Sequence, residues 1–354
     1  MSAPQVLIDV EGAVGRLTLN RPGALGALTT PMCAAMTAAL LVWRSDASVE
    51  AVLIDHAGER GFCAGGDIRA LADSVAGDGQ AAREFFFTEY RLDHLLFEYP
   101  KPVIAVMDGV TMGGGVGISW TAGYRIATER TVFAMPETGI GLFPDVGGSW
   151  FLPRLHGAAG AWLAMTGSRL RAAGCEILGI ATDVVPAARL GELKGRILAD
   201  PADLEAILTE FEADPGHSAM IDHHDEIDRL FAGRTAEEIV AALEADSSEW
   251  AAEQLALVRG KSPTSLKTAL RQLAAGRAMT DFGHAMALEM RIAARLVAGH
   301  DFSEGVRAVI LDKDGAPRWA PPDLAGVTEA MLDEIFAPLP PDQEWSPEPI
   351  PSRS

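Results

Sequence analysis

Two glycine-rich turns contain residue types that could hold a negatively charged oxygen. They are Gly61–Asp67 and Asp108–Gly115, and each follows an apolar run and leads into a helical pattern. Glycine at such a junction permits positive φ and lets a ligand approach the main chain, while free N–H groups at a helix start attract negative charge. The two turns could therefore form a two-amide oxyanion hole, although each alone is also explained as a tight turn between strand and helix.

The loop Met135–Gly148 supplies two carboxylates, Glu137 and Asp145, in apolar surroundings. Burial there would raise their pKa values and suit one of them for work as a base or nucleophile. Asp145 precedes a glycine pair and a helix start, so helix capping explains much of its presence. Capping explains Glu137 less well, which makes it the stronger candidate.

Other chemistries have weaker support in the sequence. The chain has no Gly-x-x-x-x-Gly-Lys-Ser/Thr motif, and Gly113–Gly117 lacks the spacing of a dinucleotide-binding fingerprint. Asp222–Asp225 (DHHD) is the nearest approach to a metal cluster, but adjacent residues point to different faces of a helix. We therefore expect neither a metal site nor a redox cofactor.

The elements that must position these residues alternate along the first half of the chain. Strand, glycine-rich turn and helix follow one another, which predicts a layered α/β core with ligands near the carboxyl ends of strands. Proline after two threonines marks one helix start. The expected elements are a β-ribbon of Val6–Val10 and Val14–Leu19, a helix from Pro31 to before Asp46, strands Ala51–Asp55, Val103–Met107 and Thr131–Ala134, and a helix at about Ala81–Glu98.

The second half has a different character, because glycine becomes sparse and amphipathic helical patterns follow one another from Ala187 through Leu296. Three segments are predicted: an α/β core with the active site over 1–186, a helical region over 187–336 and a proline-rich tail over 337–354. The tail is expected to be extended or disordered.

Composition excludes several classes of protein. The 354 residues are 48% hydrophobic and 22% charged, which is typical of a soluble globular protein, and the net charge of −20 argues against nucleic-acid binding. Cys33, Cys63 and Cys175 are too scattered for a disulfide framework. The N-terminus shows no export signal, and the longest uncharged stretch, Gly109–Tyr124, is too short to span a membrane. We expect a cytoplasmic protein without a membrane span.

Seven stretches of the sequence carry a resemblance to a known family. They are FCAGGDIR at Phe62–Arg69, TMGGGVG at Thr111–Gly117, FAMPET at Phe133–Thr138, GLFPDVGG at Gly141–Gly148, FLPRL at Phe151–Leu155, SPTSLKTALRQL at Ser262–Leu273 and DFSEGVRAVILDKDGAPRW at Asp301–Trp319. They resemble the crotonase (enoyl-CoA hydratase/isomerase) superfamily, and their exact residues resemble its 3-hydroxyisobutyryl-CoA hydrolase branch. The resemblance covers nearly the whole chain and implies a crotonase-like spiral of strand-turn-helix units with a helical C-terminal half.

The resemblance also implies roles for individual residues. Two main-chain amides hold the thioester oxygen in the superfamily, and they fall here on Gly66 and Gly114. The active-site acids of the branch fall on Glu89, Glu137 and Asp145. Glu137 would attack as a nucleophile or activate water, Asp145 would orient or relay a proton, and Glu89 would bind a substrate hydroxyl. By itself Glu89 is typical of a solvated charge on a helix.

The implied activity is hydrolysis of a short β-hydroxyacyl-CoA thioester. The expected substrate is 3-hydroxyisobutyryl-CoA, as in valine breakdown, with CoA as part of the substrate and no separate cofactor. The alternatives are an enoyl-CoA isomerase or hydratase and a non-catalytic acyl-CoA-binding protein. Superfamily members commonly form trimers or hexamers, but the helical half could cover the core within one chain, so a homo-oligomer stays open.

Two departures from the superfamily affect these expectations. Hydratases carry a glutamate where this chain has Gly117, so hydration by two carboxylates looks disabled. The loop Arg21–Leu28 (RPGALGAL) lacks the lysine and asparagine of the usual motif, which puts its contacts with the nucleotide in doubt. Local cations must hold the CoA phosphates, and the candidates are Arg16, Arg21, Arg69, Lys101 and Lys313.

Overall fold

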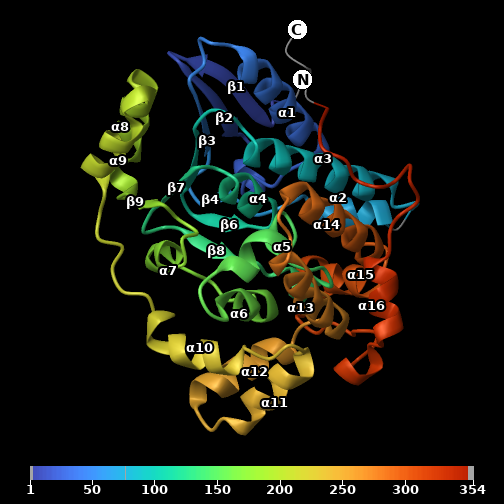
Figure 1. Cartoon of the computed structure of the whole chain (residues 1–354). Helices are drawn as coiled ribbons and strands as arrows, with labels where there is room; N and C mark the ends of the chain where they lie inside the picture. The colour runs from blue at the N-terminus through green and yellow to red at the C-terminus, as the bar shows by residue number, and fades with distance from the viewer. Residues whose placement is uncertain (1–2, 76, 350–354) are drawn as a thin grey trace.

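The computed structural model describes residues 3–75 and 77–349. It has a twisted sheet at one end and a helical extension at the other (Figure 1). The larger sheet has the order β1-β2-β3-β5-β7-β9, in which only β1 and β2 pair antiparallel. The smaller parallel sheet has the order β4-β6-β8. The strands are β1 Val6–Glu11, β2 Val14–Leu19, β3 Ala51–His56, β4 Gly61–Cys63, β5 Val103–Met107, β6 Val110–Met112, β7 Tyr124–Ala127, β8 Val132–Ala134 and β9 Asp183–Val184.

Helices cover both faces of the larger sheet. Strand β5 is a continuous apolar run, and β3 is apolar over 51–54; these residues are buried on both faces, as expected for parallel strands between helical layers. One face packs against α1, and the other packs against α8 and α9. The helices are α1 Thr30–Ser45, α2 Ile68–Val75, α3 Gln80–Phe97, α4 Gly114–Trp120, α5 Gly148–Phe151, α6 Ala159–Thr166, α7 Ala172–Ile177, α8 Leu190–Ala199, α9 Leu204–Phe211, α10 His224–Leu230, α11 Ala236–Ala245, α12 Glu249–Arg259, α13 Pro263–Arg277, α14 Phe282–Leu296, α15 His300–Val306 and α16 Glu329–Phe336.

The expected α/β fold is confirmed, and so are the β-ribbon, the first helix and strands β3 and β5. Two details were wrong. Gly61–Cys63 and Val110–Met112, expected as parts of turns, are short strands, because they pair with each other and with β8 in the second sheet. Local sequence patterns do not show such long-range pairing. Helix α2 and strand β7 were not expected as separate elements.

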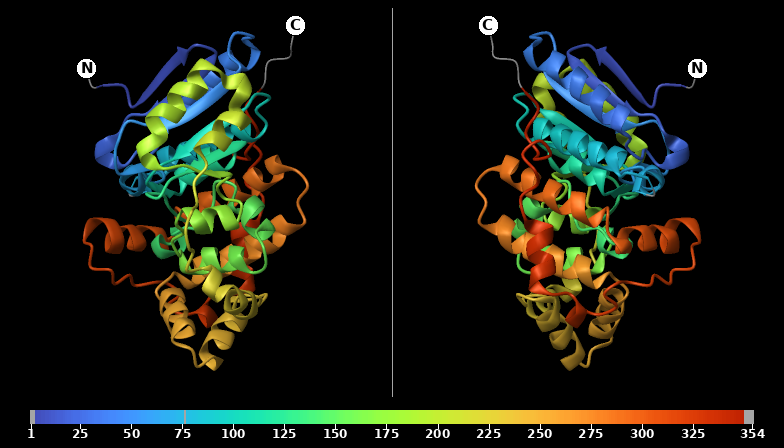
Figure 2. Two further views of the ribbon diagram at one scale, coloured as in Figure 1. Left: turned by 90° about the vertical axis from the view of Figure 1, so that its left-hand side faces the viewer. Right: turned by 90° about the vertical axis from the view of Figure 1, so that its right-hand side faces the viewer.

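The helical half of the chain occupies two places in the molecule. Helices α8 and α9 return to the larger sheet, whereas α10, α11 and α12 project from the opposite end (Figures 1 and 2). Helices α13 and α14 pack beside α5 and α3. The division into 1–186, 187–336 and 337–354 stays a prediction. None of the described helices has both the length and the apolar run needed to cross a membrane.

The described part of the proline-rich tail is extended and runs along the surface of α14 and α3. Arg291 of α14 pairs with Glu344 at 3.0 Å, and Arg91 of α3 pairs with Glu348 at 3.2 Å. Trp345 is buried, with its ring 5.5 Å from that of His94. These contacts hold the described tail against the core, and residues 350–354 lie outside the described part.

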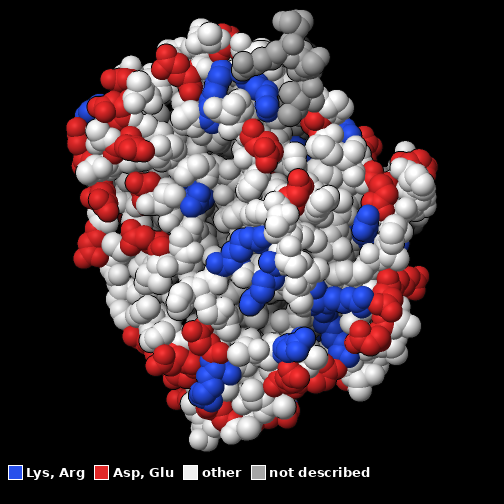
Figure 3. Space-filling view, in the orientation of Figure 1, with Lys and Arg blue, Asp and Glu red and all other residues white. Residues whose placement is uncertain are grey.

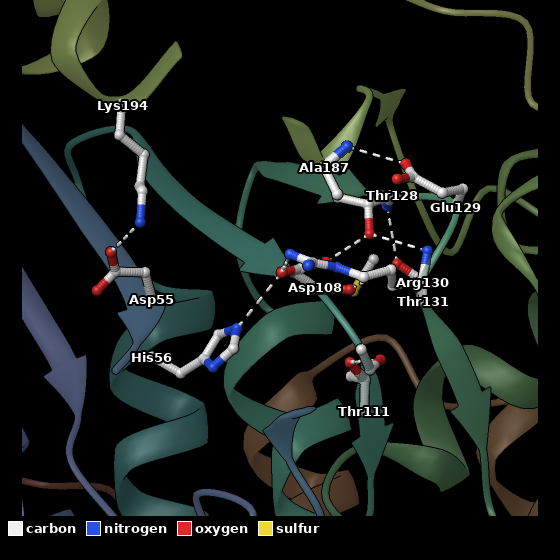
Figure 4. A network of polar contacts seen from close by, with 12 residues as sticks. Asp55, His56, Asp108, Thr111, Thr128, Glu129, Arg130, Thr131, Ala187 and Lys194 are labelled. Carbon is white, nitrogen blue, oxygen red and sulfur yellow. Dashed lines mark hydrogen bonds and ion pairs between the residues drawn. The ribbon is translucent and has the colours of Figure 1, made fainter. Parts of the chain in front are cut away.

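A polar network fastens the ends of the central strands (Figure 4). Asp108, directly after β5, accepts hydrogen bonds from Thr128 and Arg130 and lies 3.8 Å from His56 at the end of β3. Burial alone would raise the pKa of Asp108, but the neighbouring His56 and the hydrogen bonds from Arg130 and Thr128 lower it well below its usual range. The network therefore holds a charged carboxylate at the point from which the second glycine turn starts.

Candidate active site

The two glycine turns meet because β4 and β6 are paired. A Cβ on Gly113 would lie 3.1 Å from the Cα of Gly65, which is a tight contact, so the two turns approach closely. Both residues also have positive φ, 49° for Gly113 and 109° for Gly65. The following residues, Gly66 and Gly114, line one cavity, and neither main-chain N–H has an acceptor among the residues that the structure describes. Two free amide donors are thus brought to one small space.

The cavity has a volume of about 70 Å³ and combines free amides with apolar walls and carboxylates. Its apolar wall comes largely from α2, α3 and the loop after β8. The walls are formed by Ile68, Leu71, Phe85, Phe86, Met112, Pro136, Ile140 and Leu142, and the acids that reach it are Glu89, Glu137 and Asp145. All five site residues expected from the sequence, the two amides and the three acids, therefore line the same cavity.

Glu89 lies on α3 and is buried, with Oε1 lacking a hydrogen-bond partner among the described residues. A methyl group on Gly114 would collide with this oxygen, which places Glu89 directly beside one of the amide donors. Asp93, one helical turn further along α3, is fully buried, and neither of its oxygens has a described partner. Burial and then the charge of Asp93 raise the pKa of Glu89 well above its usual range.

Glu137 begins the short 3-10 turn Glu137–Ile140 that follows β8. It is 5% exposed, and its Oε1 would lie 3.6 Å from a Cβ on Gly113. Burial and then the charge of Asp145 raise the pKa of Glu137, while the ammonium of Lys261 lowers it. Glu137 therefore holds its proton readily in the free site and is stabilised as an anion by one nearby cation.

Asp145 is held by the hydroxyl of Tyr90, which donates a hydrogen bond of 2.7 Å to Oδ2. Burial raises the pKa of Asp145 to about 6, and this hydrogen bond acts in the opposite direction. The next residue, Val146, has φ of 50°. A β-branched residue in that region costs roughly 1–3 kcal/mol, so the loop is held there by its surroundings.

Two side chains of the helical half reach the Asp145 loop. Gln272 of α13 donates a hydrogen bond of 2.5 Å to the carbonyl of Pro144. Glu289 of α14 accepts hydrogen bonds of 2.9 Å from the N–H groups of Gly147 and Ser149, and a third from the Ser149 hydroxyl. Burial raises the pKa of Glu289 to about 8, although these donors act to lower it. Neither helical residue lines the cavity.

The arrangement can bind a carbonyl group and add a nucleophile to it. Two amide donors suit a developing oxyanion, and buried carboxyls with separated pKa values suit proton transfer. Among the described residues, no cluster of three or more His, Cys, Asp or Glu has metal-binding geometry. The site's own groups are thus amides, carboxyls and one tyrosine hydroxyl.

A larger cleft of about 380 Å³ lies between the ends of α3, α4 and α5. Its charged groups are Arg125 and Arg154, and both guanidinium groups donate to main-chain carbonyls near helix ends. No carboxylate of the described residues lines it, so they offer no acid for catalysis there. On the face in Figure 3, basic side chains gather near the centre, while acidic ones are spread over the margins.

The five cations proposed for CoA phosphates have different surroundings. Arg16 pairs with Asp55 and Glu11, and Arg21 pairs with Asp67, each at 2.8 Å. Lys101 donates to two main-chain carbonyls of the first helix and its end. The remaining two, Arg69 and Lys313, have no hydrogen-bond or ion-pair partner within residues 3–75 and 77–349, so their charges are not committed to a carboxylate there.

Sequence reasoning missed Tyr90, Asp93 and Glu289. A signal was present for the two acids, because each lies on the apolar side of its helix. Glu289 follows Phe282 and Met286 at helical spacing, and Asp93 follows Glu89 by four residues. An acid at such a position is buried when the helix packs. Tyr90 gave no signal beyond being adjacent to Glu89.

Comparisons of the sequence with known proteins agree with one another. The enoyl-CoA hydratase/isomerase family model matches residues 14–336. The mitochondrial 3-hydroxyisobutyryl-CoA hydrolase of Gallus gallus is 43% identical over an alignment of 347 positions that covers 96% of this chain and 90% of that protein. The enzyme of the same name from Homo sapiens has the same identity and coverage.

Solved structures of proteins that are named for other reactions share the fold. A carnitinyl-CoA dehydratase from Mycobacterium thermoresistibile superposes with a TM-score of 0.93 and 39% identity, covering 97% of this chain and 99% of that one. An enoyl-CoA hydratase from Rhodobacter sphaeroides 2.4.1 superposes with a TM-score of 0.90 and 39% identity, covering 97% and 100%. The names of the relatives therefore include both hydrolysis and hydration chemistry.

Proposed function

The chain belongs to the enoyl-CoA hydratase/isomerase family, and we propose that it hydrolyses 3-hydroxyisobutyryl-CoA to 3-hydroxyisobutyrate and CoA. The observation that carries this proposal is the convergence of two free amide donors and three buried carboxyls on one cavity of about 70 Å³. Relatives 43% identical over nearly their whole length are named for this reaction.

The amides of Gly66 and Gly114 bind the thioester oxygen in this proposal. As a nucleophile adds to the carbonyl carbon, negative charge develops on that oxygen, and the two N–H groups stabilise it. One such donor contributes roughly 3 kcal/mol to transition-state binding in other acyl-transfer enzymes. The free state of both amides supports this assignment, because an amide already bonded to the protein has nothing left to donate.

The pair of Glu137 and Asp145 carries the proton transfers. Two like charges in one buried cavity disfavour joint ionisation, so the pair holds one proton near neutral pH. In the free site the charge lies on Asp145, which the Tyr90 hydroxyl stabilises. Transfer of the Glu137 proton to Asp145 leaves Glu137 charged and ready to react.

Charged Glu137 then either attacks the thioester carbon or removes a proton from the attacking water. In both routes the C–S bond breaks with its electron pair on sulfur, and the proton on Asp145 passes to that sulfur to give the CoA thiol. Direct attack forms an acyl anhydride that water hydrolyses. Rapid quenching and mass spectrometry of the peptide containing Glu137 separates the routes, because only attack leaves an acyl adduct.

Glu89 recognises the hydroxyl of the acyl group. Its Oε1 is buried without a described partner beside Gly114, and an unpaired polar atom in an otherwise apolar wall requires a polar substrate group. A site built to hydrogen-bond a substrate hydroxyl rejects analogues that lack it, by as much as roughly 10⁴-fold in other enzymes. This residue therefore favours a β-hydroxyacyl group over a plain acyl group.

Hydration of an enoyl-CoA is the second candidate, favoured by the solved relative from Rhodobacter sphaeroides 2.4.1, which is named an enoyl-CoA hydratase. The site argues against it at Gly117. A Cβ there would lie 2.7 Å from both oxygens of Asp93 and 2.8 Å from Val146, so α4 has no room for a carboxylate at this position. Asp93 itself does not line the cavity. The water-holding pair of a hydratase is therefore incomplete.

We assign the nucleotide end of the substrate to a second cleft next to the acyl cavity. A cleft of about 350 Å³ is lined by Pro22, Leu25, Arg60 and neighbouring residues. Strand β4 connects the two sites, since Gly61 lines this cleft and Ala64 lines the acyl cavity. We place the CoA nucleotide here, with Arg60 available to its phosphates.

Three further expectations stay predictions. They are a reaction without a resident cofactor, a cytoplasmic location and a homo-oligomer, for which the monomer stays the alternative. The curated relatives are named mitochondrial. Cys33, Cys63 and Cys175 are free and buried.

Release of free thiol tests the reaction. Purified protein is mixed with 3-hydroxyisobutyryl-CoA, isobutyryl-CoA or crotonyl-CoA, and CoA thiol and loss of the enoyl group are followed by absorbance. We expect the fastest thiol release from the hydroxylated substrate and slow hydration of crotonyl-CoA. Hydration of crotonyl-CoA faster than thiol release from 3-hydroxyisobutyryl-CoA would assign the protein to the hydratases.

Glu137→Gln tests the catalytic pair. Amide and carboxylate are similar in shape, but the amide neither attacks nor accepts a proton. We expect kcat to fall at least about a hundredfold while the dissociation constant for the CoA ester changes little. Stopped-flow thiol release and calorimetric binding measure the two separately. Near-normal thiol release by the variant would remove Glu137 from the mechanism.

A further inference from the structure

The loop that carries Asp145 has a conformation that its own residues do not favour. Val146 and Gly147 both have left-handed backbones, with φ of 50° and 94°. Inside the loop, the N–H of Gly148 donates a hydrogen bond of 2.8 Å to the carbonyl of Asp145. A valine in that region persists only where the surrounding structure determines it. The determinant must therefore come from outside the loop.

Two buried side chains from α13 and α14 provide it, and they bracket Asp145. The Gln272 amide binds the carbonyl of Pro144, one residue before the acid. The Glu289 carboxylate binds the N–H groups of Gly147 and Ser149, two and four residues after it. Glu289 also accepts from the Ser149 hydroxyl, so its two oxygens meet three donors. The loop is held on both sides of the reacting carboxyl.

From this bracket we propose that Glu289 is a positioning residue for thioester hydrolysis, which fixes Asp145 for proton transfer without touching the substrate. This inference rests on the function proposed above. Asp145 lines the cavity and Glu289 does not, so Glu289 acts on the chemistry without touching the substrate, by holding the loop and by its charge on neighbouring groups. A glutamine at this position would present an N–H₂ group to one of the two main-chain N–H donors, so the hydrogen bond from that donor would be lost.

A double-mutant cycle separates positioning from a purely structural role. The variants are Glu289→Gln, Asp145→Asn and the two combined, and kcat and KM are measured with 3-hydroxyisobutyryl-CoA. We expect Glu289→Gln to lower kcat by about tenfold or more with KM within about twofold of the parent. In the Asp145→Asn background the same change is expected to alter kcat by less than about twofold, because its route to chemistry is gone.

The matched control is Glu253→Gln, an exposed glutamate on α12, which is expected to leave kcat and KM unchanged. Parental kcat in folded Glu289→Gln would overturn the inference. So would an equal loss of kcat in both backgrounds, because a structural defect acts whether or not Asp145 is present.

Ser149→Ala decides the question if Glu289→Gln does not fold. It removes one of three donors and leaves both main-chain N–H groups on Glu289. We expect a loss of kcat of a few fold that disappears in the Asp145→Asn background, and a parental kcat would overturn the inference. A parent protein that releases no CoA contradicts the proposed function and with it this inference. An active parent with unaffected variants contradicts the inference alone.

Discussion

Tyr90 controls the charge on Asp145 through a single hydrogen bond. Its hydroxyl lies 2.7 Å from Oδ2 in a buried setting, and a donor to a carboxylate favours the charged form. Burial acts in the opposite direction and raises the pKa of Asp145 to about 6. The pair with Glu137 needs one negative charge to react. Activity is therefore expected to fall as the pH drops below about 6 and Asp145 takes up a proton.

Tyr90→Phe is expected to move this acid limb to higher pH. Without the hydroxyl the anion of Asp145 loses its donor, so its pKa rises and more of the site is protonated at a given pH. Profiles of kcat against pH for thiol release measure the shift. Tyr99→Phe is the control, because the Tyr99 hydroxyl binds the carbonyl of Leu40 outside the cavity. If the acid limb of the Tyr90→Phe pH profile stays at the same pH as in the parent, or moves to lower pH, this account of Asp145 is contradicted.

Some site residues could be recognised from the sequence, and others could not. Glu137 and Asp145 stand out because they interrupt an apolar loop between glycines. Glu89 was found by resemblance only, since a glutamate on an amphipathic helix is usually solvated. Asp93 and Glu289 were overlooked although each continues the apolar spacing of its helix, and the packing of α3 and α14 shows that these sides of the helices are buried.

At the scale of elements, the close packing of α3 on α4 depends on Gly117. Both oxygens of Asp93 would lie 2.7 Å from a Cβ at that position, and Val146 would lie 2.8 Å away. Real Cβ atoms do not approach neighbours so closely, so one of the elements must shift to admit a side chain. Because Val146 follows Asp145, the shift reaches the catalytic loop.

Gly117→Ala is therefore expected to lower the midpoint of thermal unfolding by several degrees and to reduce kcat. Overpacking of a buried site typically costs about 1–3 kcal/mol. The double variant Gly117→Ala with Asp93→Ala removes one of the two obstacles and is expected to recover part of the midpoint. Circular-dichroism melts measure both. A single variant as stable as the parent would show that α3 and α4 are not closely fitted here.

The same scale shows why part of the fold was not predictable. Strands β1, β2, β3 and β5 of the larger sheet were visible because they contain apolar runs bounded by turn residues, as in Val103–Met107, whereas β7 and β9 were not expected. Strands β4 and β6 have three residues each and owe their existence to pairing with each other and with β8. A local pattern of three residues containing glycine reads as a turn. The second sheet, which joins the two amide donors, was therefore absent from the expectation.

At the scale of the whole molecule, five buried acids make stability depend on pH. Burial raises the pKa of Asp145 to about 6 and that of Glu289 to about 8, and it raises those of Glu89, Asp93 and Glu137 as well. The folded state therefore binds more protons than the unfolded chain between about pH 4 and pH 8. Under that condition the free energy of unfolding falls as the pH rises.

We expect lower stability at pH 8 than at pH 5. Each carboxyl that must ionise in the folded state lowers the free energy of unfolding by up to about 1.4 kcal/mol per pH unit within its window. Urea unfolding at the two pH values measures the difference. Asp93→Asn removes one buried acid and is expected to flatten the dependence. A protein that becomes more stable between pH 5 and pH 8 would contradict the assignment of these groups as buried acids.

The site residues, including the bracket around Asp145, come from one chain, and this has a genetic consequence. The two amides, the three acids of the cavity and Glu289 all belong to one polypeptide. A cell that carries two different damaged copies of the gene, one encoding Glu137→Gln and the other Asp145→Asn, cannot assemble an intact site from them. We therefore expect no intragenic complementation: the two variants, mixed or co-expressed, release no more thiol than the sum of their separate rates.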